Sequence, residues 1–205
     1  GMMKDLLQEK NALYGRFAVT IKLNELNYLD TAKFYPDKTP YDKVAHYAVF
    51  GGSPFVNQAL RPTATLRENI VSTILNPVSA VYLYASQLLL SDYSVKINAE
   101  RIFAVIGNGK KRYSEIEDKL DVKKTGNLAK QMKPLRDLEI ISRNYPINKL
   151  NDSKKSTFEI NDNLLRFYFT FIYKNASALQ VLGAEAFYDE YVAPTLTDFI
   201  SRRFE

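Results

Sequence analysis

Cysteine is absent from the 205 residues, and histidine occurs once, as His46. Without cysteine the chain forms no disulfide, offers no thiol nucleophile and holds no cysteine-ligated metal. One histidine leaves too little for a Ser-His-Asp triad or a two-histidine metal site. His46 lies in a stretch that reads as a helix, so we interpret it as an ordinary helix residue. The lack of cysteine also fits a reducing cytoplasm, which is the location we expect.

Long hydrophobic runs are missing as well. No apolar run reaches the roughly 18 residues that a membrane span needs. The most apolar stretch, residues 164–173, is too short and is interrupted by Arg166. Charged residues, among them Asp5 and Glu9, interrupt the only N-terminal segment that resembles a signal peptide. We therefore expect no membrane partner. Hydrophobic residues still make up 46% of the chain, enough to bury a core, which excludes global disorder.

The sequence also lacks the motifs of phosphate-binding loops. No Gly-x-x-x-x-Gly-Lys-[Ser/Thr] occurs, and residues 107–111 carry the right letters at the wrong spacing. Those glycines are more simply explained as the end of a helix. No Gly-x-Gly-x-x-Gly follows a strand, and the carboxylate pair Asp189-Glu190 is indistinguishable from a helix surface. The residues thus predict no catalytic constellation, no metal site and no cofactor in this chain.

Positive charge is concentrated in one block of the sequence. Residues 96–160 carry 15 Lys and Arg against 9 Asp and Glu, a net charge of +6, within a chain whose net charge is +5. Residues 1–95 have a net charge of +1 and residues 161–205 of −2. A local basic excess is the electrostatic footprint of a surface that meets phosphate, although a solvated face gives the same count.

The basic block also has a distinctive order of elements. Residues 97–107 predict an amphipathic helix, residues 114–120 a second helix with Ser114 as its N-cap, and residues 125–138 a third. Alternating residues then predict strands over 140–147 and 156–160. Three helices followed by a hairpin, with a short turn between helices two and three, are the order of a winged helix-turn-helix. Its expected core consists of Ile102, Val105, Ile116, Leu120, Leu128, Met132, Leu135 and Phe158.

The flanking segments predict helices for the most part. A helix is expected over residues 2–10 and a strand over 17–23. Several short helices follow, one of which begins at Thr39-Pro40 and ends at Gly51-Gly52. The apolar stretch 164–173 predicts a helix buried on most sides. The fold class we expect is therefore mainly α.

Four segments appear in order that resemble one known family. They are Leu13-Tyr14-Gly15-Arg16, Ile21-Lys22-Leu23, Tyr47 to Pro54, and Phe158 to Phe169 with its Asp-x-x-Leu-Arg-Phe-x-Phe run. Together they resemble the archaeal and bacterial AAA-like ATPases of the STAND class. The resemblance implies a helical lid in residues 1–95 with the tail of an ATPase core, a winged helix in 96–160 with a two-stranded wing, and C-terminal helices in 161–205 that lead to a nuclease-like region.

The same resemblance implies that this chain is a fragment that lacks the P-loop half of the ATPase. ATP and magnesium are then cofactors of the intact family, and this chain is not an enzyme by itself. The family pattern carries over a nucleotide-binding role to Gly52 and Pro54, and to Arg16.

Two functions are consistent with the sequence. In the first, the module binds DNA: the third helix offers Lys124, Asn127, Lys130 and Gln131 to the major groove, and the wing offers Lys149, Lys154 and Lys155 to phosphates. In the second, the module is regulatory and packs on an ATPase core, on another protein or on a second copy, without touching DNA.

Overall fold

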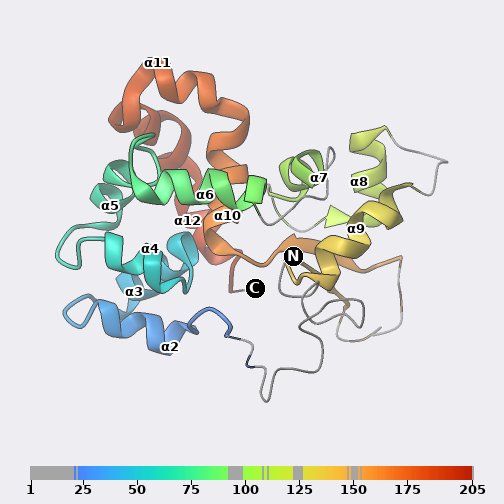
Figure 1. Ribbon diagram of the computed structural model, residues 1–205, viewed down its shortest axis with the longest axis horizontal. Helices are drawn as coiled ribbons and strands as arrows, with labels where there is room; N and C mark the ends of the chain where they lie inside the picture. The colour runs from blue at the N-terminus through green and yellow to red at the C-terminus, as the bar shows by residue number, and fades with distance from the viewer. Residues whose placement is uncertain are drawn as a thin grey trace, which may run out of the picture.

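The computed structural model describes residues 21, 23–91, 99–107, 109, 111–121, 127–146, 148, 152 and 154–204. It is mainly helical, with one small antiparallel sheet, so the expected fold class is confirmed at that level. The helices and strands form two parts that lie side by side in Figure 1. One contains α2–α6 and α10–α12, and the other contains α7–α9 with the strands. We call them the helical part and the mixed part.

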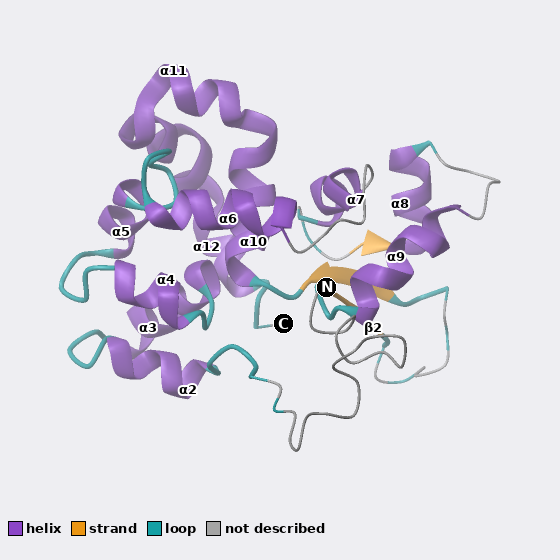
Figure 2. Ribbon diagram, in the orientation of Figure 1, coloured by secondary structure: helices purple, strands orange, loops and turns teal. Residues whose placement is uncertain are grey.

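The helical part takes its elements from both ends of the described chain, and Figure 2 shows no strand among them. From the first half come α2 (Tyr28–Thr31), η1 (Ala32–Phe34), α3 (Pro40–Phe50), α4 (Pro54–Ala59), α5 (Leu66–Ser72) and α6 (Ala80–Ser91). From the end come α10 (Asn163–Phe167), η2 (Tyr168–Ile172), η3 (Tyr173–Asn175), α11 (Ala176–Phe187), η4 (Tyr188–Val192), η5 (Ala193–Thr195) and α12 (Leu196–Ser201).

Local signals in the sequence set the ends of these helices. The Thr39 side chain accepts a hydrogen bond from the backbone of Asp42, and Pro40 occupies the first turn of α3. Gly51 ends α3 with φ 70°, a left-handed conformation that glycine adopts at little cost. Both predicted ends of α3 are thus confirmed. Asp162 caps α10 in the same way, through the backbone of Leu165.

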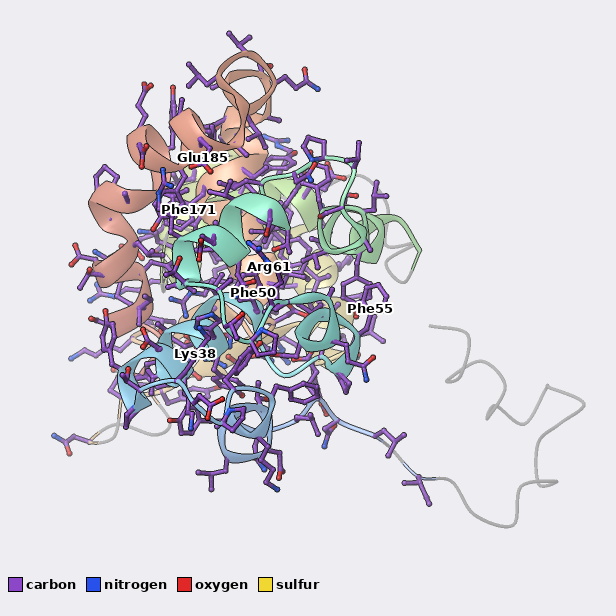
Figure 3. The ribbon with its side chains drawn as sticks, turned by 90° about the vertical axis from the view of Figure 1, so that its left-hand side faces the viewer. Lys38, Phe50, Phe55, Arg61, Phe171 and Glu185 are labelled. Carbon is purple, nitrogen blue, oxygen red and sulfur yellow. The ribbon has the colours of Figure 1, made fainter. Side chains whose placement is uncertain are left out.

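One hydrophobic core joins the two halves of the helical part. Phe50 of α3 and Phe171 of η2 are both buried in it, 121 residues apart in sequence, and Figure 3 shows them within the body of this part. Phe55 of α4, in contrast, stands at its edge and is half exposed. Residues 161–205, which the sequence presents as a separate C-terminal segment, therefore share their core with the first segment rather than forming a core of their own.

The mixed part is built from the basic block. Its elements are α7 (Ala99–Ile106), β1 (Lys111–Arg112), α8 (Tyr113–Leu120), α9 (Asn127–Asp137), β2 (Ile141–Asn144) and β3 (Thr157–Ile160). Both neighbouring pairs in the sheet are antiparallel, and the strand order is β1-β3-β2. Ile141 pairs with Ile160 and Lys111 with Phe158, so β3 is the central strand.

The face predicted for the core of this part is confirmed. Seven of the eight expected residues are buried, and Val105 is partly buried against the same cluster. Their spacing places them on one side of each helix, because residues three and four apart lie on one helical face. The buried side of β3 adds Ile160, and β2 adds Ile141.

The predicted N-cap of α8 needs correction. Ser114 does not cap α8: the helix begins at Tyr113, and the backbone N–H of Arg112 donates to the Glu115 carboxylate at 2.5 Å. The reason is that β1 pairs with β3 up to Arg112, so the helix starts directly where the strand ends. Pro134 lies inside α9, which continues to Asp137. The predicted helix 2–10 lies outside the described residues, as does most of strand 17–23; Ile21 and Leu23 are in neither helix nor strand.

The segment α10–η2 belongs to both cores at once. Phe167 and Phe171 pack in the helical core, whereas Leu165 and Phe169 pack in the core of the mixed part. Phe169 contacts Phe103 of α7, with ring centroids 5.2 Å apart. The prediction of a helix that is buried on most sides is confirmed, since one face serves each part of the molecule.

Candidate nucleic-acid interface

A hollow of about 800 Å³ opens on the mixed part between α8, α9 and the β2–β3 hairpin. We call it the basic hollow, because four of the residues that line it carry positive charge and none is acidic. Its lining consists of Tyr113, Ser114, Ala129, Met132, Lys133, Arg136, Arg143, Lys154 and Phe158. A surface lined in this way attracts anions.

Helix α9 brings two of these cations to the hollow. Successive residues of an α-helix are rotated by about 100°, so Lys133 and Arg136 share the flank that also carries Ala129. Leu128 and Met132 direct the adjacent face into the core. Both basic residues are exposed. Because Leu128 and Met132 fix the buried face of α9, Lys133 and Arg136 must lie on the flank beside that face.

Arg143 of β2 is held in place by its neighbours. Its Nε donates to the Ser156 hydroxyl at 2.8 Å, and its guanidinium lies over the rings of Tyr145 and Phe158, at 5.0 and 5.6 Å from the ring centroids. Ser156 is fully buried and Phe158 belongs to the core. A guanidinium fixed by stacking and a hydrogen bond loses little entropy when it binds an anion.

The turn of the hairpin separates the two lysines that were expected to act together. The Asp152 carboxylate accepts from the backbone N–H groups of Lys154 and Lys155, at 3.1 and 3.3 Å. Lys154 lines the basic hollow. Lys155 instead lines a second hollow of about 410 Å³, with Asn144 and Glu159 among its neighbours. Of the two lysines, Lys154 is therefore the one that lines the same hollow as the basic residues of α9.

The charges of the hollow differ in how far they are already paired. Lys133 forms an ion pair with Asp137 of the same helix at 2.7 Å, which partly offsets its charge. Among the described residues, neither Arg136 nor Lys154 has a carboxylate within ion-pair distance. Within the described part of the chain, Arg136 and Lys154 are thus the two charges of the hollow whose nearest recorded partners include no carboxylate. Burial, followed by the charge of Glu117, raises the pKa of the Tyr113 phenol at the rim, so it remains a neutral hydrogen-bond donor.

The residues predicted to contact DNA do not all lie together. Lys130 is exposed on α9, on the side opposite the core. Gln131 is half-buried and lies about 140° around the helix from Arg136, on the far flank from the hollow. Asn127 begins α9, but its side chain is outside the described part, as are Lys124 and Lys149 entirely.

Sequence reasoning missed Lys133, Arg136 and Arg143. The signal for Lys133 and Arg136 was present, because their i, i+3 spacing beside the Leu128-Met132-Leu135 face puts them on one flank. Arg143 had a weaker signal: its position in the strand opposite Phe158 follows only from the register of the sheet.

The residues assigned to a nucleotide by resemblance lie in the helical part. Gly52 approaches the backbone of Leu26, whose N–H donates to the Gly52 carbonyl at 3.0 Å, and a Cβ on Gly52 would lie 1.9 Å from the Leu26 oxygen. Pro54 is exposed at the start of α4. Burial, then the nearby charge of Asp162, raises the pKa of Glu25 to about 7 beside this turn. Arg16 lies outside the described residues.

Two further features are missing from the described part of the chain. No cluster of three or more His, Cys, Asp or Glu there has the geometry to hold a metal ion. None of the helices that the structure describes combines the length and the apolar character needed to cross a membrane.

Comparison with known proteins finds a relative that aligns with most of this chain. Over 180 residues the chain is 26% identical to "Uncharacterized protein MJECL04" of Methanocaldococcus jannaschii. The alignment covers 87% of this chain and 40% of that protein, so the chain spans less than half of its relative's length. No protein-family model matches the chain, and no solved structure matches it.

Proposed function

We propose that residues 99–160 form a winged helix-turn-helix that binds duplex DNA, and that the basic hollow is its main contact surface. The connectivity supports the fold: three helices and a hairpin occur in order, and a short strand after the first helix pairs with the returning strand of the wing. In this arrangement α9 is the helix that faces the major groove and the β2–β3 hairpin is the wing.

One observation carries the DNA proposal. Cations from three different elements, α9, β2 and the hairpin turn, converge on one hollow whose described lining contains no carboxylate. A phosphate backbone presents one negative charge every few ångströms, so a row of Lys and Arg on a concave surface matches it without any base contact. A solvated surface of equal net charge would instead intersperse acidic residues among the basic ones.

The same geometry separates the residues proposed to contact phosphates from those proposed to contact bases. Arg136, Arg143 and Lys154 are proposed to contact phosphates, whereas Lys130, on the outer face of α9, is proposed to enter the groove. Asn127 stands at the start of α9, which is where recognition helices make base contacts. Gln131 lies on the other flank, so its proposed contact is with a base on the side away from the hollow.

Replacement of two unpaired cations tests the proposal. The variant Arg136→Gln/Lys154→Gln should lose affinity for several duplexes of unrelated sequence by a similar factor, on the order of tenfold for each lost phosphate contact at 0.1 M salt. Fluorescence anisotropy with labelled duplexes measures it. Lys174→Gln is the matched control, because Lys174 is an exposed lysine of η3 in the helical part.

Equal affinity of the double variant and the parent would reject the DNA role of the hollow. The alternative function, a regulatory module that packs on a protein partner, would then be the better account of the mixed part. With either function, we infer that this chain does not turn over ATP, and magnesium-dependent phosphate release by the purified chain would contradict that inference.

A further inference from the structure

A third cavity, of about 460 Å³ and distinct from the two hollows described above, lies where the two parts of the molecule meet. Its wall is shared by the end of α7, the strand β3, the segment α10–η2 and the helix α12. This cavity does not include any residue of the basic hollow, and the DNA proposal makes no use of it.

Arg166 is the unusual residue of this wall. It is only 7% exposed, yet among the described residues no carboxylate lies within ion-pair distance of it. One of its Nη atoms donates to the carbonyl of Phe199, and the guanidinium stacks on the Phe199 ring at 4.2 Å. A guanidinium has five N–H donors, so this carbonyl leaves most of them without a recorded partner.

The charged groups around Arg166 disfavour its protonated form more than they favour it. Burial first, and then the charges of Arg203 and Arg202, lower its pKa to about 10, against the opposing effect of Glu159. Arg166 is still protonated at neutral pH. Arg202 extends from the end of α12 toward the turn after α7, where its Nη1 lies 3.6 Å from the position that a Cβ on Gly109 would take. Two guanidinium groups therefore border the same cavity.

Two carboxylates also line the cavity, Glu159 and Asp198. Glu159 is directed toward β2, where its Oε1 accepts from Asn144 Nδ2 at 2.5 Å and from Ser142 Oγ at 3.5 Å. Asp198 is exposed on α12. Neither of them forms an ion pair with Arg166 or Arg202, so both guanidinium groups keep donors for an added acceptor.

We propose that this cavity binds an oxyanion of the phosphate type, free or as a terminal monoester, through Arg166 and Arg202. Buried charges in proteins are almost always paired, and a tetrahedral oxyanion offers several acceptor oxygens to the planar fork of a guanidinium. The anion would supply the negative charge that Arg166 lacks and would reduce the repulsion among the neighbouring arginines. Because both parts of the molecule line the cavity, occupancy should stabilise the folded chain by mass action.

The test is a titration of the purified full chain with inorganic phosphate, without DNA, at constant ionic strength set by chloride. A saturable rise in melting temperature is expected, together with a binding isotherm in calorimetry. Arg202→Gln should weaken phosphate binding about tenfold, the loss expected for one charge-assisted hydrogen bond. Arg202 is exposed, so this change should leave the fold intact. Lys174→Gln is again the control and should bind phosphate as the parent does.

A second variant should change the affinity for phosphate in the opposite direction. Glu159→Gln keeps an acceptor for Asn144 and Ser142 but removes a negative charge from the cavity wall, so phosphate should bind several-fold tighter. A purely structural role of these residues predicts no gain in affinity. Methyl phosphate serves as the probe for a monoester: affinity equal to that of phosphate assigns a terminal phosphate group, and loss of binding assigns the free ion.

The proposal is overturned if phosphate shifts the melting temperature no more than chloride does, or if Arg202→Gln and Lys174→Gln bind it equally. It is also overturned if Glu159→Gln weakens phosphate binding, since the Glu159 carboxylate would then not repel the bound anion. The DNA proposal is tested separately: Arg136→Gln/Lys154→Gln should keep its affinity for phosphate, whatever its affinity for duplex DNA.

Discussion

The two parts of the molecule use their basic side chains differently. In the helical part Arg67 of α5 donates to Asp189 at 3.0 Å and lies 2.7 Å from Glu185, so two carboxylates share one cation. Lys38 and Lys43 there donate to backbone carbonyls. These contacts hold the segments of the helical part to one another.

In the mixed part, Arg136 and Lys154 instead line a hollow that has no acidic residue in its described lining. The net charge of a segment therefore locates a binding surface only after the ion pairs within the segment are counted.

Leu135→Asp should strongly destabilise the mixed part. Leu135 is fully buried in α9, and an unpaired carboxylate there should lower the free energy of unfolding by about 3–5 kcal/mol. Thermal or urea unfolding followed by circular dichroism measures it. Lys130→Asp places the same residue on the exposed face of α9 and should change stability by no more than about 0.5 kcal/mol. An unchanged melting temperature for Leu135→Asp would mean that the buried face of α9 is assigned wrongly.

The two lysines of the hairpin turn sharpen the comparison within the mixed part. Lys154→Ala should weaken duplex binding by on the order of tenfold, because it removes a phosphate contact from the basic hollow. Lys155→Ala should weaken it less, since Lys155 lines a different hollow that also contains Glu159. Anisotropy titrations at one salt concentration compare the two. Equal losses would show that the DNA path follows the turn rather than the hollow.

The single histidine should make a smaller contribution, to the pH dependence of the stability of the helical part. His46 Nδ1 donates to the Asp42 carbonyl at 2.7 Å, which leaves Nε2 to accept from Asn69 at 3.3 Å. Burial is the main cause that lowers its pKa below the unfolded value of about 6.5. The unfolded chain therefore binds a proton first, and stability should be complete above pH of about 6.5 and fall as the pH drops below it.

Urea unfolding of the parent and of His46→Gln at several pH values between about 5 and 7 tests this prediction. The variant should lack the part of the pH dependence that His46 causes. Parallel curves for the two proteins would contradict the assignment of a neutral, buried imidazole.

Periodicity predicted the parts of the fold that depend on local patterns. The face formed by Leu128, Met132 and Leu135 follows from i, i+4 and i+7 spacing, and the start of α3 follows from Thr39-Pro40. The two-residue strand β1 was missed because Lys111-Arg112 has no alternation to recognise. The return of residues 164–200 to the core of the first segment was missed too, since the burial of Phe50 and Phe171 in one core leaves no local signal in the sequence.

The candidate site was predicted only in part, for a physical reason. The sequence shows which residues are basic, but whether two of them converge depends on helix rotation and strand register. Lys154 and Lys155 are adjacent in the chain and line different hollows. Arg136 and Arg143 are separated by a turn and line the same one.

The salt dependence of duplex binding tests the central claim most directly. Each phosphate contact on duplex DNA contributes about 0.9 to the slope of log affinity against log salt concentration. The parent and Lys174→Gln should therefore give the same steep slope, and Arg136→Gln/Lys154→Gln should give a slope shallower by about 1.8. Identical slopes for all three proteins would contradict the claim that the basic hollow binds the phosphate backbone.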